Sequence, residues 1–151
     1  MNKPKYLYKS EESFKVFEFT SEGSKGEIRK LVQFSETGTE NVYNLAFGDF
    51  DENTQEINDF SVTNNGDSQK VLTTVASTVY AFIDKHPEAM IFATGSTNAR
   101  TRLYRIGITN NLTEISKDFV VFGLMKNGNH WEHFTVGVEY EAFLISKKEN
   151  I

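Results

Sequence analysis

The residue types best suited to chemistry in this chain gather in one short stretch, residues 94–105. An apolar run ends there at a threonine and a glycine, hydroxyl and amide side chains follow, and then come three of the chain's four arginines. A buried strand that passes through a glycine into a capped helix leaves backbone N–H groups that favour an anion. The residues that we predict to bind a ligand are Gly95, Ser96, Thr97, Asn98, Arg100, Arg102, Tyr104 and Arg105.

The predicted ligand is anionic, either a nucleotide-like molecule or a nucleic-acid phosphate, because arginine forks bind phosphate and carboxylate groups. The stretch matches neither G-x-x-x-x-G-K-[ST] nor G-x-G-x-x-G, since Arg100 follows Gly95 by five residues and no lysine is near. A structural interpretation stays open beside this one. In it Gly95 forms a tight turn, Ser96 or Thr97 caps the helix, and the arginines pair with acidic residues of the first half of the chain.

Two other classes of function also stay open, because no catalytic residue can be assigned from spacing. The first is an enzyme, such as a toxin-type nuclease or transferase, or a hydrolase in which His133 activates Ser96 or Thr97. The second is a protein–protein interaction module whose acidic N-terminal half meets a basic partner. His130 and His133 are three residues apart in a predicted strand, so their side chains point to opposite faces and do not suggest a shared metal. We expect no metal and no cofactor.

Length and composition predict a single domain over residues 1–151 that lies in the cytoplasm and does not bind a membrane. The chain has no cysteine, which excludes disulfides and thiol chemistry, and 13 phenylalanines supply a core. No apolar run approaches the roughly 20 residues of a membrane helix, and the N-terminus lacks the apolar core of a signal peptide. The oligomeric state cannot be inferred.

The net charge of −5 is unevenly distributed. Residues 11–66 hold twelve acidic and four basic residues, whereas residues 67–151 hold nine of each. An acidic first half argues against a protein that coats nucleic acid with its whole surface. A local contact through the arginines is compatible with this charge distribution.

The elements that position the candidate site begin with a succession of short strands. Alternating apolar residues and turn clusters predict strands at residues 14–20, 28–34, 42–47 and, more weakly, 56–63, which suggests an antiparallel meander. Apolar residues at helical spacing predict a helix from an N-cap at Asp67 to about His86, before Pro87. A right-handed crossover through this helix would make a strand at 89–94 parallel to the strand at 56–63.

The second half is predicted to complete the sheet. A helix at about 97–109 has Ala99, Leu103 and Ile106 on one side. A nearly continuous apolar strand spans 119–125, the pair Asn127-Gly128 favours a type I′ hairpin turn, and one or more strands return over 131–145. The predicted fold is therefore α+β, with a mostly antiparallel sheet of six to seven strands packed against two helices.

Several phrases of the chain resemble a domain of unknown function of about 150 residues that is found mainly in Bacteroidota. The phrases are Phe17-Glu18-Phe19, Lys25-Gly26, residues 43–49, residues 64–67, residues 140–145 and, above all, Gly95-Ser-Thr-Asn-Ala-Arg-Thr-Arg-Leu-Tyr104. The resemblance covers nearly the whole chain and implies one complete folding unit. It implies no activity.

Overall fold

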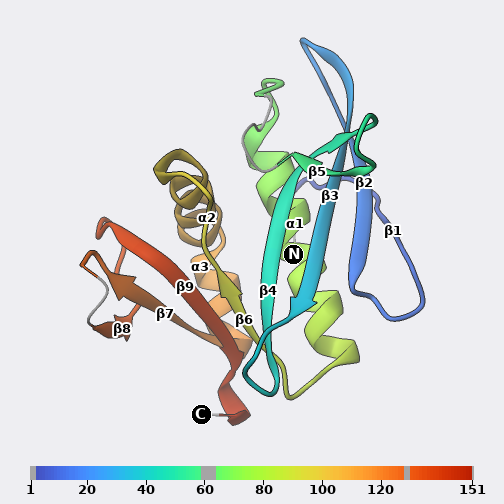
Figure 1. Cartoon of the computed structure of the whole chain (residues 1–151). Coiled ribbons are helices and arrows are strands. Elements are labelled where there is room, and N and C mark those ends of the chain that lie inside the picture. The colour runs from blue at the N-terminus through green and yellow to red at the C-terminus, as the bar shows by residue number, and fades with distance from the viewer. Residues whose placement is uncertain (1–2, 59–63, 128–129, 151) are drawn as a thin grey trace.

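The computed structural model describes residues 3–58, 64–127 and 130–150, which build one mixed nine-stranded sheet and three α-helices (Figure 1). The strands are β1 (Lys9–Ser10), β2 (Val16–Gly23), β3 (Gly26–Glu36), β4 (Val42–Asp51), β5 (Glu56–Asn58), β6 (Met90–Ala93), β7 (Phe119–Met125), β8 (Trp131–His133) and β9 (Tyr140–Lys147). The helices are α1 (Ser68–Lys85), α2 (Asn98–Asn110) and α3 (Leu112–Asp118), and a 3₁₀ turn, η1 (Lys148–Asn150), follows β9. The predicted α+β class is confirmed.

The N-terminal half is the predicted antiparallel meander. The sheet order is β1-β2-β3-β4-β6-β9-β7-β8, with β5 paired to β4, and the pairs from β1 to β5 are all antiparallel. Alternation decides which side chains face the core: Phe17 and Phe19 of β2 are buried, and each of their chain neighbours in β2 is half-buried. Residues 59–63 of the predicted fourth strand lie outside the described part of the chain.

Helix α1 forms over the predicted residues and covers this half of the sheet. Its buried stripe includes Val71, Val75, Val79 and Phe82, and the Phe82 ring stacks on Phe34 of β3 with centroids 4.3 Å apart. Asp67 occupies the N-cap position, as predicted, but its side chain makes no capping bond. That carboxylate instead accepts hydrogen bonds from the hydroxyls of Tyr6 and Ser21, and so links the N-terminal segment, β2 and α1.

The predicted crossover is wrong in its partner strand. β6 is parallel to β4, with Leu45 opposite Ala93, whereas β5 runs antiparallel to β4. Therefore β6 runs opposite to β5. The reason is that β4 is long enough to pair with β6 through its first half and with β5 through its last residues. Helix α1 thus connects the meander back to the middle of the sheet.

Two strands and one helix go beyond the predicted number of elements. β1 and β8 are two and three residues long, and α3 follows α2 after Asn111 alone. The return segment after β7 is divided into β8 and β9, which pair with the two edges of β7. Part of the predicted type I′ turn, Gly128, lies outside the described residues.

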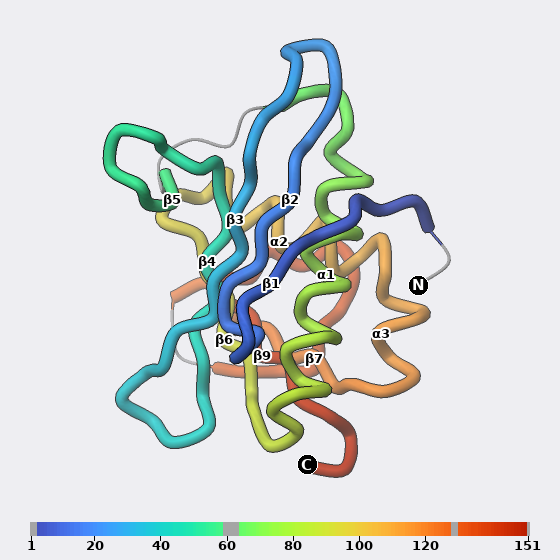
Figure 2. The backbone as a smooth tube through the Cα atoms, turned by 90° about the vertical axis from the view of Figure 1, so that its right-hand side faces the viewer, coloured from blue at the N-terminus to red at the C-terminus, as the bar shows by residue number. Residues whose placement is uncertain are grey.

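The three helices pack against the same face of the sheet, which twists so that β7 and β9 cross the direction of β2 to β4 (Figure 2). The side chains that meet between them are Leu45, Ala93 and Ile145 from the sheet and Val79, Ile108 and Ile115 from the helices. No helix in the described part of the chain is long and apolar enough to cross a membrane.

Candidate functional site

A cleft of about 660 Å³ opens at the carboxyl end of β6. β6 ends at Ala93, between Leu45 of β4 and Phe143 of β9, and the chain then turns into α2. One wall of the cleft is this turn and the start of α2, from residues 94–99 to Thr101, Arg102 and Arg105. The other wall comes from Lys126, the residue after β7, and from residues 139–141 at the start of β9. The cleft therefore contains most, but not all, of the residues predicted from sequence.

The turn into α2 satisfies part of its own backbone. The Thr97 hydroxyl caps the helix by accepting a hydrogen bond from Arg100 N at 3.2 Å, as the structural interpretation predicts. The Thr101 hydroxyl accepts from Gly95 N at 3.0 Å and donates to Thr97 O at 3.2 Å. Within the described chain, the Asn98 and Ala99 amides have no side-chain acceptor. The helix N-terminus thus offers an anion fewer N–H groups than the sequence predicted.

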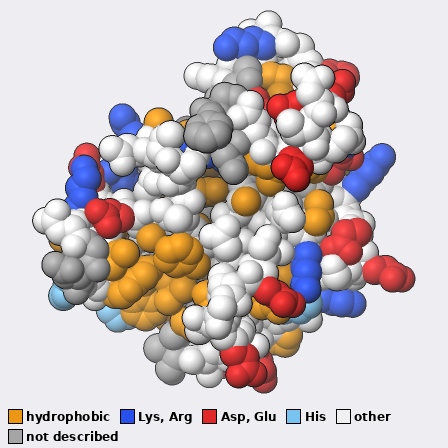
Figure 3. Space-filling view, viewed as in Figure 1, with side chains coloured by type: hydrophobic (Ala, Val, Ile, Leu, Met, Phe, Trp, Pro, Cys, Tyr) orange, Lys and Arg blue, Asp and Glu red, His pale blue; other side chains and the backbone are white. Residues whose placement is uncertain are grey.

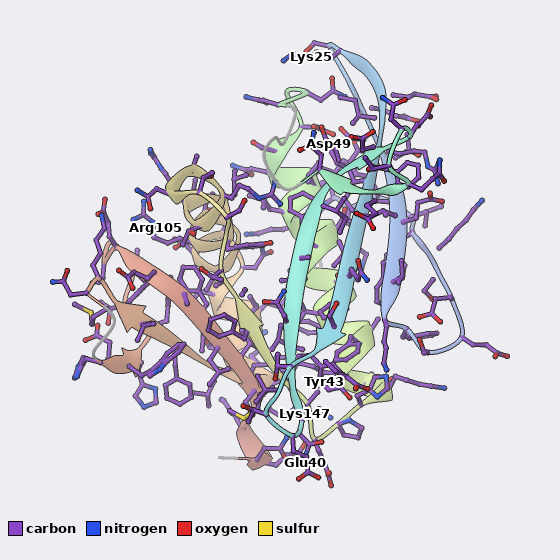
Figure 4. All side chains as sticks on the ribbon, in the orientation of Figure 1. Lys25, Glu40, Tyr43, Asp49, Arg105 and Lys147 are labelled. Carbon is purple, nitrogen blue, oxygen red and sulfur yellow. The ribbon has the colours of Figure 1, made fainter. Side chains whose placement is uncertain are left out.

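The cations of the cleft come from both walls. Arg102 is exposed and Arg105 half-buried on α2, and Figure 4 shows Arg105 on the side of the helix that faces β7 and β9. Lys126 Nζ lies 3.1 Å from Glu139 Oε2 on the other wall. The hydrogen bond and charge of Lys126, and then the charges of Arg105 and Arg102, lower the pKa of Glu139. All three cations thus act on one carboxylate.

Arg100 and Tyr104, both predicted to bind the ligand, do not line the cleft. Arg100 is only 6% exposed, and its Nη2 lies 3.3 Å from the place that a Cβ on Gly48 would occupy. Its buried Nη1 has no hydrogen-bond partner in the part of the chain that the structure describes. Tyr104 is 7% exposed and belongs to the core between the helices and the sheet. We therefore leave both residues out of the candidate site.

The buried face of α2 explains this difference. The predicted stripe was Ala99, Leu103 and Ile106, but Ala99 is exposed and the other two are half-buried. The buried residues of α2 are Arg100, Tyr104, Gly107 and Ile108. Gly107 faces α1, where an added Cβ would be in van der Waals contact with Leu72 Cβ at 3.4 Å. Packing against α1 and the sheet, which hydrophobicity alone does not reveal, therefore decides that the arginine and the tyrosine face inward.

Sequence reasoning missed the second wall of the cleft altogether. Lys126, Glu139 and Glu141 lie more than 20 residues beyond the arginines, and nothing in their spacing connects them to α2. Tyr140, which lies between the two glutamates, stood in the phrase 140–145 that carries the family resemblance. The apolar pattern had predicted a strand there, but only that phrase, which contains Glu141 as well, connected the strand with the arginine stretch. In Figure 3, basic and acidic side chains lie side by side at the upper left, where α2 and the β7–β9 end are located.

The histidines do not belong to the cleft. His133 lies opposite Phe122 in the β7–β8 pair. Val121, the residue before Phe122, is buried in the core, so strand alternation places both Phe122 and His133 on the face of the sheet away from the helices. It therefore does not lie beside Ser96 or Thr97, as the hydrolase hypothesis requires. In Figure 3, hydrophobic and histidine side chains lie together at the lower left, apart from the charged group.

Comparison with known proteins identifies a family but no function. One family profile, described as a family of unknown function (DUF6934), matches residues 2–148. No curated protein and no solved structure matches the chain. Since the match covers nearly all of the 151 residues, the chain belongs to the DUF6934 family of unknown function.

Proposed function

We propose that this protein binds an anionic, phosphate-bearing ligand in the cleft at the start of α2, and that it does so in the cytoplasm, as its composition predicts. One observation carries the proposal. Arg102 and Arg105 from α2 and Lys126 from the end of β7 line the same cleft of about 660 Å³. Two carboxylates, Glu139 and Glu141, share the cleft, so the side chains there have a net positive charge.

The chemistry of the lining supports phosphate as the anionic group. Guanidinium groups donate paired, charge-assisted hydrogen bonds to phosphate oxygens, and an ammonium group adds a point charge. Hydroxyl side chains at Ser96 and Thr97 lie immediately before the first residue of α2, where the helix dipole also favours negative charge. A cleft of this size is within the usual range of small-molecule sites.

The surroundings of Glu139 favour a role in binding over a role of this residue in acid–base catalysis. An efficient general acid or base has a pKa near the working pH. Lys126, Arg105 and Arg102 instead lower the pKa of Glu139, which keeps this carboxylate ionised and makes it a weak proton acceptor. The nuclease or transferase alternative therefore gains no support from this residue. The described residues of the acidic N-terminal half lie outside the cleft, so an additional protein partner there is compatible with the proposal.

Thermal unfolding with and without inorganic phosphate and adenosine monophosphate, at constant ionic strength, tests the proposal. A ligand at about 100 times its dissociation constant stabilises the folded state by about 2.7 kcal/mol, which corresponds to roughly 5–10 °C for a domain of this size. We expect Arg102→Ala and Arg105→Ala each to lose most of this shift. Arg29→Ala, which removes the same charge from the β2–β3 pair, should keep it. If neither compound shifts the wild-type protein, the proposal is wrong.

A further inference from the structure

The wall of the cleft formed by β9 carries two carboxylates opposite the arginines. Glu139 and Glu141 flank Tyr140 at the start of β9, and both are exposed. Glu139 accepts a hydrogen bond from Lys126, and the charges of Arg105 and Arg102 across the cleft lower its pKa further. The site is therefore cationic along α2 and mixed in charge along β9.

Glu141 is held in place by its surroundings. Its Oε1 accepts a hydrogen bond from Asn127 N at 3.1 Å, and its backbone oxygen accepts one from the Thr94 hydroxyl at 2.8 Å. The second bond joins the two walls at the point where the chain leaves β6. Within the described chain, the other carboxylate oxygen, Oε2, has no hydrogen-bond donor. It remains able to accept a hydrogen bond from a ligand.

Such a lining discriminates between kinds of phosphate ligand. A bare phosphate ion brings negative charge and no sugar or base donors to the two glutamates. A strand of nucleic acid has such donors, but it also brings the charged phosphates of the neighbouring nucleotides, which the two glutamates repel. A small phosphate ester that carries hydroxyl or amino donors complements both walls, because its phosphate meets the arginines and its donors meet the carboxylates. The volume of about 660 Å³ also leaves room for more than a phosphate group.

We infer that the ligand is a small phosphate ester with hydrogen-bond donors, of the sugar phosphate or mononucleotide class, and that Glu141 recognises its hydroxyl or amino groups. This inference rests on the proposed anion site. Nucleic acid is the alternative that this inference excludes. Glu141 acts here as a specificity residue, since the phosphate itself is bound by Arg102, Arg105 and Lys126.

Calorimetric titration with three probes tests the inference: inorganic phosphate, ribose 5-phosphate and a short single-stranded oligonucleotide. For the wild type we expect ribose 5-phosphate to bind at least about tenfold more tightly than phosphate, since a hydrogen bond to a charged group is commonly worth that factor or more. Glu141→Gln retains an acceptor for Asn127 N but loses the charge. It should weaken ribose 5-phosphate about tenfold and leave phosphate binding unchanged or stronger.

The control variant is Glu88→Gln, because Glu88 is an exposed glutamate that precedes β6 at the opposite end of the strand. It should bind all three probes as the wild type does. The inference is overturned if ribose 5-phosphate binds no more tightly than phosphate, if Glu141→Gln weakens both alike, or if the oligonucleotide binds most tightly. In those cases the anion site itself still stands. If no probe binds, both proposals fall.

Discussion

Replacing Gly95 with alanine is expected to lower the free energy of unfolding by about 2 kcal/mol, through a clash with the first turn of α2. A Cβ at this position would lie 2.5 Å from both Arg100 Cβ and Thr101 N and 2.8 Å from Arg100 C. Two of these three atoms belong to the backbone, so no side-chain rotation relieves the contact. Gly95 is thus required for close approach of two backbone segments, since it does not have a positive φ.

The magnitude follows from three contributions. Overpacking of this kind costs about 1–3 kcal/mol, and loss of the 3.0 Å hydrogen bond from Gly95 N to Thr101 Oγ1 adds about 1 kcal/mol. The smaller conformational freedom of alanine in the unfolded chain offsets about 0.4–1 kcal/mol. For a domain of this size, a net loss of about 2 kcal/mol lowers Tm by roughly 4–8 °C.

Thermal unfolding followed by circular dichroism, together with urea titration, measures the effect. Gly38→Ala is the matched control, because a Cβ there meets nothing within 4 Å and Gly38 does not have a positive φ. This variant should be unchanged or more stable by up to about 1 kcal/mol. The reasoning is refuted if Gly95→Ala unfolds within about 1 °C of the wild type, or if both variants lose the same stability.

Three further variants test other parts of the structure. Asn65→Ala removes three side-chain hydrogen bonds that join the β2–β3 hairpin to the segment before α1, and it should lower the free energy of unfolding, measured by urea titration, by about 2–3 kcal/mol. The control Asn64→Ala loses one exposed hydrogen bond of a turn and should lower it by less than about 1 kcal/mol. Arg100→Met should raise the free energy of unfolding by about 1 kcal/mol or more, because it removes a buried guanidinium whose Nη1 has no acceptor among the described residues. A loss of stability would contradict this explanation. Hydrogen bonds from the Ser13 hydroxyl and amide, the two largest causes, lower the pKa of Glu11 from 4.5 to about 2, so its contribution to stability is present above pH 4.5 and is lost as the pH falls toward 2. Ser13→Ala should raise this pKa in an NMR titration, and an unchanged value would exclude that cause.

Local pattern was sufficient for the elements whose burial follows one rule along the chain. The spacing of Val71, Val75, Val79 and Phe82 predicted α1, because a helix against a sheet buries one stripe, and the N-cap at Asp67 and Pro87 predicted its ends almost to the residue. The same applies to Phe17 and Phe19 in β2, where alternation separates core from surface. The α+β class and the antiparallel meander followed from these two periodicities and from the turn residues between them.

Local pattern did not predict the contacts between segments that are far apart in the chain. The partner of β6 depended on the length of β4, and the inward face of α2 depended on how this helix packs against α1 and the sheet. Hydropathy assigned the inward stripe of α2 to Ala99, Leu103 and Ile106, although Arg100 and Tyr104 are among the residues that are buried. Arginine spacing therefore predicted the location of the candidate site but not which arginines reach it.

The class of the fold, the position of its principal helix and a stretch of residues suited to an anion could all be predicted from the sequence, because each depends on residues that are near one another in the chain. The two walls of the cleft could not. Long-range contacts bring the stretch opposite Lys126, Glu139 and Glu141, and they turn Arg100 and Tyr104 toward the core. These features depend on long-range strand pairing and helix packing, and no local periodicity encodes which distant surfaces come into contact.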